Sequence, residues 1–297
     1  MQTASLLRAL KAGFEDLSPQ LRAAARWVID NPEEVALLTA REQARRARVT
    51  PATLTRLAQH FGLSGYEDVR RLHAEDVRRH PRSYRGRAEE LLHRRDTEGD
   101  AALVQDIFSS LAHHLHALTA PDAVRRFTAV AERIAKGQRV FCFGARSTFS
   151  VAQIFHYLRT LFGDASVMVD GPGGTGIDAL RAIGPKDVLL AVTMSPYARE
   201  TAKAAKFAAS RGAAVIAITD SEVSPLASVA TETLIVHTET PSFFDTMAPA
   251  FAAMECLAAL VAARRGPRTL AALAASEKQL ADFDTYILPL QKKRNRP

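Results

Sequence analysis

Two stretches that share one order of residue types constrain the fold of this chain more than any other feature. In the first, the apolar run 140–143 stops at Gly144 and passes through Ser147 and Thr148 into an amphipathic segment. Later in the chain, the apolar run 188–192 leads through another hydroxyl-bearing turn into a second amphipathic segment. A strand that turns in this way into a helix aims free backbone N–H groups, and the positive end of the helix dipole, at a bound anion. Two such turns at the carboxyl ends of parallel strands predict one anion-binding crevice.

Short apolar runs alternate with amphipathic segments from residue 139 onward. This alternation is typical of an α/β domain, in which helices cover both faces of a parallel sheet. The expected strands cover residues 139–143, 166–169, 188–192, 214–218 and 233–237. The expected helices lie near residues 149–162, 175–183, 198–211, 224–229 and 247–263. We therefore expect a five-stranded parallel sheet flanked by helices.

Charge is distributed unevenly along the 297 residues. Residues 1–95 carry 18 Lys and Arg against 12 Asp and Glu, a net charge of +6. Residues 96–291 carry 17 against 20, a net charge of −3, and the last six residues add +4. A basic first third attached to a mildly acidic remainder indicates a polyanionic partner for the first third. Because basic surfaces are common, charge alone leaves nucleic-acid binding and a plain solvated surface equally open.

The first third has the spacing of a helix-turn-helix motif. A capping box at 39–42 opens a short helix at 40–46, a turn follows at 47–49, and Thr50 with Pro51 starts a second helix. In this motif the start of the second helix faces base edges, and neighbouring arginines suit phosphates. The expected DNA-facing residues are Thr50, Ala52, Thr53, Thr55 and Arg56, with Arg45, Arg46 and Arg48 at the phosphates. The alternative is an ordinary helical bundle with a solvated basic face.

The stretch 80–87 is polar and contains both proline and glycine, so we expect a hinge there. The amphipathic segment 101–118 is expected to be a connecting or dimer-packing helix. Its three histidines, at 113, 114 and 116, lack metal-ligand spacing, and we expect packing or solvated side chains and no metal site. The expected domains are 1–80, the connection 81–125, the α/β domain 126–265, and a C-terminal helix with a basic tail at 266–297.

Composition limits the class of protein. No apolar run reaches the roughly 18 residues of a membrane span, and the N-terminus lacks a secretory pattern, so we expect a cytoplasmic protein and no membrane partner. The two cysteines, Cys142 and Cys256, are expected to be buried free thiols. The turn at 144–147 lacks the dinucleotide fingerprint, and the glycine-rich stretch 170–176 lacks the ending of a P-loop, so no cofactor is expected.

Residues 14–80 resemble the N-terminal domain of RpiR-type transcriptional regulators. The resemblance is carried by the runs Leu-Ser-Pro-Gln-Leu-Arg at 17–22, Val-Thr-Pro-Ala-Thr-Leu-Thr-Arg at 49–56 and Phe-Gly-Leu-Ser-Gly-Tyr at 61–66. Two positions depart from the family pattern. The family usually has glycine in the motif's turn, where this chain has Arg48, and favours leucine where Gln43 stands. The resemblance implies a DNA-binding helix-turn-helix domain.

Residues 126–265 resemble a sugar isomerase (SIS) domain, which typically binds phosphosugars through serine and threonine hydroxyls. The resemblance is carried by the runs at 143–148, 192–201 and 218–226. Carried over by position, it implies ligand contacts in the first two turns, to which we add Arg146 and Tyr197. The full expected set is Arg146, Ser147, Thr148, Thr193, Ser195, Tyr197 and Thr201. Because Arg146 stands where the family usually has a second glycine and can clamp a carboxylate or phosphate, the ligand could also be a sugar acid.

Together the two resemblances imply an all-α helix-turn-helix domain followed by an α/β SIS domain, in a cytoplasmic transcriptional regulator of carbohydrate metabolism. Its partners would be operator DNA, a phosphosugar or sugar-acid effector, and further copies in a homodimer or homotetramer. The alternative is a phosphosugar isomerase or amino-sugar-phosphate lyase with an accessory helical domain. Such an enzyme needs a general base near the reacting carbon atoms of the sugar. The sequence offers Glu200, Glu255 and His237, but nothing in it places them at a substrate. We therefore expect no catalytic residue.

Overall fold

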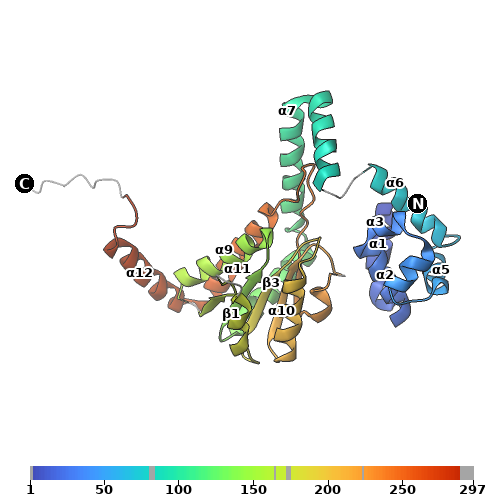
Figure 1. The fold of residues 1–297 in the computed structure, drawn as a ribbon. Coiled ribbons are helices and arrows are strands. Elements are labelled where there is room, and N and C mark those ends of the chain that lie inside the picture. The colour runs from blue at the N-terminus through green and yellow to red at the C-terminus, as the bar shows by residue number, and fades with distance from the viewer. Residues whose placement is uncertain (1–2, 80–83, 164, 172–174, 223, 288–297) are drawn as a thin grey trace, which may run out of the picture.

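The computed structural model describes residues 3–79, 84–163, 165–171, 175–222 and 224–287. A helical N-terminal domain and an α/β domain are connected through a helical hairpin (Figure 1). The N-terminal domain consists of α1 (Thr3–Ala12), a 3₁₀ turn (Phe14–Asp16), α2 (Pro19–Asp30), α3 (Pro32–Leu37), α4 (Ala40–Arg46), α5 (Pro51–His60) and α6 (Tyr66–Arg79). The expected starts at Pro19 and Pro51 are confirmed, although the Ser18 side chain makes no capping hydrogen bond.

The N-terminal helices enclose their own hydrophobic core. Leu6, Val28, Leu54 and Leu57 are at most 2% exposed within it. In α5 the buried positions recur at helical spacing, so one face of that helix packs in the core and the opposite face is exposed. Trp27, the single tryptophan of the chain, packs against this core.

The helical hairpin is α7 (Tyr84–Ala117), which is interrupted at Gly99, where φ is 83° and ψ is 167°. That left-handed φ suits glycine and reverses the chain, so the two arms run side by side (Figure 1). Arg94 of the first arm forms an ion pair with Asp106 of the second. The expected hinge at 80–87 is therefore too long: residues 84–87 are helical, and 80–83 lie outside the described residues. The expected helix at 101–118 forms the second arm.

The α/β domain contains one five-stranded, all-parallel sheet, which confirms the expected fold class. Its strands are β1 (Val140–Gly144), β2 (Ser166–Met168), β3 (Val188–Val192), β4 (Ala214–Thr219) and β5 (Glu232–Ile235). The strand order is β2-β1-β3-β4-β5, with Val140 level with Val188 in the register of β1 and β3. The two sequence stretches that predicted a shared crevice therefore form neighbouring central strands.

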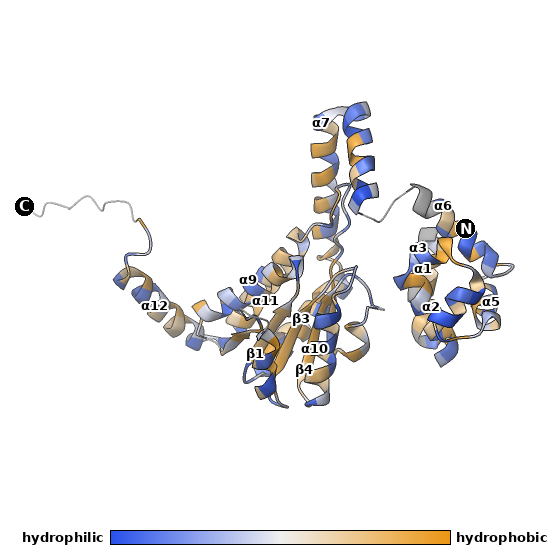
Figure 2. Ribbon diagram, viewed as in Figure 1, coloured by the Kyte–Doolittle hydropathy of each residue, from blue (hydrophilic) through white to orange (hydrophobic). Residues whose placement is uncertain are grey.

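Helices cover both faces of the sheet. The helices of this domain are α8 (Pro121–Lys136), α9 (Ser147–Leu161), α10 (Arg199–Ser210), α11 (Ala248–Arg265) and α12 (Pro267–Asp282). Successive residues of each central strand alternate between two cores: Cys142 packs with α8, α9 and α11, whereas Phe141 packs on the face covered by α10. Figure 2 shows these strands as the hydrophobic centre of the domain.

Three expected elements differ from the structure. The segment expected as a helix at 175–183 is a 3₁₀ helix (Gly176–Ala182), and the one at 224–229 shortens to a 3₁₀ turn (Ala227–Val229). In the latter, the Ser224 hydroxyl accepts the N–H of Ala227, as a helix cap does, but the helical turn that follows ends at Val229. The last strand ends at Ile235 and leaves His237 beyond it. The C-terminal helix is present as α12; the basic tail lies outside the described residues.

Candidate functional site

The N-terminal domain contains a helix-turn-helix arrangement formed by α4, a three-residue turn and α5. The Thr39 hydroxyl accepts the N–H of Glu42 at 3.3 Å, and the Thr50 hydroxyl accepts the N–H of Thr53 at 3.2 Å. Each threonine thus satisfies one backbone donor that its helix cannot pair internally. These caps fix where the two helices begin.

The turn between the helices holds Arg48 at a φ of 56°, a conformation that glycine usually occupies. The Val49 N–H donates to the Ala44 carbonyl at 2.9 Å, and the Arg48 N–H donates to the Arg45 carbonyl at 3.3 Å. This is the Schellman pattern that ends many helices. An arginine at this position costs about 1 kcal/mol relative to glycine, and the turn still adopts the required geometry.

Gln43, which replaces the family's leucine, is fully buried and all its polar atoms are used. Its amide nitrogen donates to the carbonyls of Val35 at 3.0 Å and Leu38 at 2.8 Å. Its amide oxygen accepts the Tyr66 hydroxyl at 2.5 Å. Gln43 therefore caps the end of α3 and ties α4 to α6, while burial raises the pKa of Tyr66.

Two arginines of α4, Arg45 and Arg46, are exposed but already paired. Arg45 and Arg46 both donate to Glu42, at 2.5 and 2.9 Å, and Arg46 also reaches Glu34 at 2.8 Å. Hydrogen bonds from the two guanidinium groups lower the pKa of Glu42 to about 2. Both arginines keep donors free for phosphate, because a guanidinium has five N–H groups. A phosphate contact there must compete with Glu42.

Fewer of the expected DNA-facing residues are exposed on the outer face of α5 than the sequence predicts. Ala52 and Arg56 are exposed, Thr55 is half-buried, and the exposed Thr50 uses its hydroxyl as the helix cap. The expectation that Thr53 is exposed was wrong, since this residue is only 2% exposed and its hydroxyl lies 3.0 Å from that of Thr50. Its place three residues after the cap turns it toward the core, so it supports the helix start.

The expected anion-binding site of the α/β domain is where β1 and β3 end side by side. The strand order reverses between these two strands, and open parallel sheets bind ligands at such a point. Gly144 ends β1, and a Cβ there would lie 2.3 Å from the Thr148 carbonyl oxygen. Only glycine therefore allows the first turn of α9 to approach the strand this closely.

Arg146 and Ser147 form the exposed edge of this first turn. Arg146 has a φ of 58° and a ψ of −128°, which is a glycine region of the backbone map, and its side chain is exposed. Ser147 is exposed and is the first residue of α9, so its hydroxyl lies beside the unpaired N–H groups of that helix. This turn presents a cation, a hydroxyl and a helix N-terminus together.

Three of the expected ligand contacts are buried in the fold. The Thr148 hydroxyl lies 2.8 Å from the Ala145 carbonyl and 3.0 Å from the Val192 carbonyl, which joins the first turn to β3. The Thr193 hydroxyl accepts the N–H of Ala198 at 3.1 Å and holds the second turn. Thr201 is fully buried, and its hydroxyl has no partner among the residues described. These positions support the crevice, whereas exposed groups must make the first contact with a ligand.

Asp220, directly after β4, is a site residue that sequence reasoning missed. The Ser195 N–H donates to its carboxylate at 3.3 Å, and the Tyr197 hydroxyl also bonds to it. Burial raises the pKa of both Asp220 and Tyr197. Ser195 itself is exposed. The carboxylate therefore holds the second turn in place. The signal in the sequence was the position of Asp220 between Thr219 and Ser221, directly after the apolar run 214–218.

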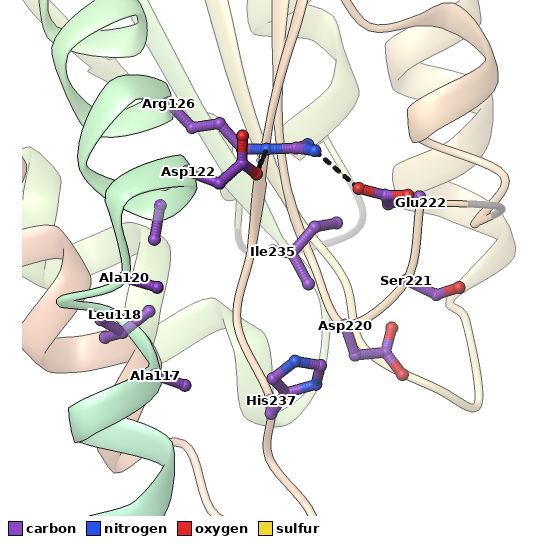
Figure 3. A pocket seen from close by; sticks show the side chains of 11 residues that line it. Ala117, Leu118, Ala120, Asp122, Arg126, Asp220, Ser221, Glu222, Ile235 and His237 are labelled. Atoms are coloured by element: carbon purple, nitrogen blue, oxygen red, sulfur yellow. Dashed lines mark hydrogen bonds and ion pairs between the residues drawn. The ribbon is translucent and has the colours of Figure 1, made fainter. Parts of the chain in front are cut away.

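A cavity of about 320 Å³ lies beside Asp220, between the ends of β4 and β5 and the start of α8 (Figure 3). Arg126 crosses its upper part, bonded to Asp122 at 2.8 Å and to Glu222 at 2.6 Å. His237 and Asp220 line the lower part (Figure 3). The cavity borders the crevice because Asp220 belongs to both.

The other residue types considered from sequence lie away from the crevice. His114 is 8% exposed and packs at the base of the hairpin. Within the described parts of the chain, no three His, Cys, Asp or Glu side chains are placed to hold a metal ion. Both cysteines are free; Cys142 is buried, but the expected burial of Cys256 was wrong, because it lies on the outer side of α11 with Glu255. No helix in the described ranges is long and apolar enough to span a membrane.

Comparison with known proteins identifies the second domain. The SIS domain family matches residues 133–262. The solved sugar isomerase domain of an RpiR transcription factor from Sphaerobacter thermophilus is 26% identical, with a TM-score of 0.54, over 60% of this chain and 97% of that one. Vibrio vulnificus NanR, solved in complex with ManNAc-6P, shares the fold over 94% of this chain and 98% of its own, with 22% identity and a TM-score of 0.53.

Two proteins named as HTH-type transcriptional regulators also match about three quarters or more of this chain. The HTH-type transcriptional regulator HexR of Pseudomonas aeruginosa is 23% identical over 235 residues, which cover 76% of this chain and 77% of HexR. An uncharacterised HTH-type transcriptional regulator of Caldanaerobacter subterraneus is 22% identical over 242 residues, or 80% of this chain and 81% of its own. In having a helix-turn-helix arrangement ahead of a SIS domain, this chain is similar to these transcriptional regulators.

Proposed function

We propose that this chain is a DNA-binding transcriptional regulator of carbohydrate metabolism whose SIS domain binds a phosphorylated sugar or a related sugar acid. The observation that carries the proposal is the presence, in one chain, of a capped helix-turn-helix with an exposed basic face and a SIS domain in which β1 and β3 end side by side in hydroxyl-bearing turns. The relatives named as regulators match 80% and 76% of this chain.

At the DNA, α5 enters the major groove with Ala52, Thr55 and Arg56 toward the bases. A bidentate arginine on a base edge is worth about 1–3 kcal/mol of discrimination. Thr50 holds the helix start against the backbone of the DNA. Arg45, Arg46 and Arg48 contact phosphates. Two copies in a homodimer, or four in a homotetramer, would place two such helices on a pseudo-palindromic operator.

At the effector, the phosphate or carboxylate binds between the two turns. Ser147 and the N–H groups at the start of α9 supply hydroxyl and backbone donors, and Arg146 supplies the charge. Ser195 contacts the effector from the second turn, and Tyr197 shapes the wall beside it. The buried hydroxyls of Thr148, Thr193 and Thr201 support these turns from behind.

The function of a sensor fits this site better than that of an isomerase or lyase. Glu200 and Glu255 are both exposed, and Glu255 lies on the outer face of α11. His237 lines the neighbouring cavity, separated from the first turn by β3 and β4. Asp220 accepts the Ser195 N–H and the Tyr197 hydroxyl, as expected of a residue that holds the second turn in place.

The DNA half of the proposal is tested by comparing Arg56→Ala with Arg71→Ala. Both variants lose one positive charge from the same domain, but Arg71 lies on α6 and is paired with Asp68. We expect Arg56→Ala to weaken operator binding by about 5- to 150-fold while changing binding to random DNA far less. Arg71→Ala should bind the operator within about threefold of the wild type. Equal losses in both variants, measured by fluorescence anisotropy at fixed salt, would contradict the assignment of α5.

The effector half is tested by comparing Ser195→Ala with Ser210→Ala in calorimetric titrations of a phosphosugar panel. Ser210 is equally small and exposed, but it lies at the far end of α10. A lost hydrogen bond to a charged group should weaken binding by about 1.5–3 kcal/mol, or roughly 10- to 150-fold, in Ser195→Ala alone. Unchanged affinity in that variant would remove the second turn from the effector site.

A further inference from the structure

The connection between β5 and α11 forms a closed loop. The Thr246 N–H donates to the Thr238 carbonyl at 2.9 Å, so residues 238–246, which we name the joint loop, leave and re-enter the domain at one place. The loop begins directly after His237, which lines the cavity beside Asp220 (Figure 3). Its position therefore depends on the ends of β4 and β5, and Asp220, which follows β4, also accepts the Ser195 N–H of the candidate effector site.

The first arm of α7 holds the joint loop through one side chain. The Arg87 guanidinium donates to the Ser242 carbonyl at 2.9 Å and the Thr240 carbonyl at 3.4 Å, and forms an ion pair with Asp245 at 2.9 Å. The Arg87 and Asp245 side chains are only 19% and 25% exposed. Because a planar guanidinium fixes three acceptors at once, this contact defines the orientation of the arm relative to the loop.

The second arm of α7 holds the same loop at another point. The Ser110 hydroxyl donates to the Glu239 carbonyl at 3.0 Å, and His114 Nε2 donates to the same carbonyl at 2.6 Å. The joint loop is thus bonded to both arms of the hairpin, across more than a hundred residues of sequence. A displacement of the loop must move the hairpin or break these bonds.

The hairpin also connects to the DNA-binding domain. Arg87 lies in the first turn of α7, which begins at Tyr84, shortly after α6 of the helix-turn-helix domain ends at Arg79. These contacts therefore run from the ends of β4 and β5, through the joint loop, to the helix that follows the DNA-binding domain.

The geometry points to the joint loop and Arg87 as the mechanical connection through which effector binding changes DNA affinity. This inference rests on the proposed function and names how its two sites are coupled. Arg87 contacts neither ligand, so it is a positioning residue: it converts a shift of the strand ends into a reorientation of α7. Allosteric coupling of this kind typically changes affinity by about 5- to 150-fold.

The test compares Arg87→Gln with Arg85→Gln in the full-length protein. Both variants remove one positive charge within one turn of α7, but Arg85 is exposed and pairs only with Glu89 of its own arm among the described residues. For each variant, anisotropy would give the operator affinity with and without the hexose 6-phosphate or sugar acid to which the wild type responds, and calorimetry would give the affinity for that compound.

We expect Arg87→Gln to bind the compound as the wild type does, while the ratio of operator affinities with and without it falls to within about threefold of unity. Asp245→Asn, which removes the other half of the ion pair, should behave in the same way and decides the matter if Arg87→Gln fails to fold. Arg85→Gln should keep the wild-type ratio of operator affinities with and without the compound. If Arg87→Gln and Asp245→Asn fold and both keep the wild-type ratio of operator affinities, the inference is overturned while the proposed function stays intact. A wild type that binds no operator, or responds to no compound, would instead refute the proposed function and with it the coupling.

Discussion

Replacing Gln43 by leucine, the residue that the family favours, should destabilise the N-terminal domain. The substitution leaves the carbonyls of Val35 and Leu38, and the hydroxyl of Tyr66, without the partners they have in the structure. Each intramolecular hydrogen bond contributes about 0.5–1.5 kcal/mol, and an unsatisfied buried group costs about 1–3 kcal/mol. Burial of the leucine side chain returns about 1.5–3 kcal/mol. We expect a net loss of about 2–4 kcal/mol in the free energy of unfolding.

A double-mutant cycle with Tyr66→Phe separates the hydrogen bond from the change in shape. Alone, Tyr66→Phe should cost about 1–3 kcal/mol, because it leaves the Gln43 amide oxygen buried and unpaired. In the Gln43→Leu background the same change should cost close to nothing, since the hydroxyl is already unpaired there. The coupling between the two positions should therefore be about 1–3 kcal/mol.

Urea titrations followed by tryptophan fluorescence suit this cycle, because Trp27 is the single tryptophan and packs in the N-terminal core. The signal reports on that domain without contribution from tryptophan elsewhere. A Gln43→Leu variant as stable as the wild type, or a cycle whose two changes simply add, would refute the role of Gln43 as the cap of α3 and its tie to α6.

Three further substitutions test single features of the fold. Arg48→Gly should raise the unfolding free energy of the N-terminal domain by about 1 kcal/mol, since it relieves a positive φ, and a lower urea midpoint would count against the strain. Gly144→Ala should abolish effector binding without weakening operator binding, because the new Cβ would lie 2.3 Å from the Thr148 carbonyl oxygen and push the first turn of α9 away. An unchanged affinity for the effector in calorimetry would disprove this close approach. Asp220→Asn should gain stability relative to the wild type as pH rises from 4 to 8. The raised pKa of Asp220 means that the folded wild type loses stability as that carboxyl ionises. If unfolding followed by circular dichroism shows a difference in stability between the two proteins that does not change with pH, this reasoning is contradicted.

The elements that carry a strong residue pattern were predicted well. The strand at Val188–Val192 and the helix at Ala40–Arg46 lie where the pattern placed them, because a five-residue apolar run and a capping box each define a local structure. The positive φ at Arg48 also confirms that the turn keeps the geometry for which the family uses glycine.

The roles of individual hydroxyls could not be predicted in the same way. Thr148 and Ser147 are neighbours in one turn, yet the first bonds to the carbonyl of Val192 on another strand and the second is exposed. Nothing local distinguishes them, since the acceptor is 44 residues away. The contacts of the joint loop could not be predicted for the same reason, because Arg87 and Ser242 are 155 residues apart in the sequence.

The most direct test of the account is the affinity of the wild-type protein for the DNA upstream of its own transcription unit. Fluorescence anisotropy at one fixed salt concentration would compare that DNA with a scrambled sequence, with and without each member of a panel of hexose 6-phosphates, N-acetylhexosamine 6-phosphates and sugar acids. The account predicts operator binding at least about a thousandfold tighter than binding to scrambled DNA, and a shift of about 5- to 150-fold with one class of compound. Equal affinity for both DNAs with every compound would contradict the regulator assignment and favour an isomerase or lyase assay on the same panel.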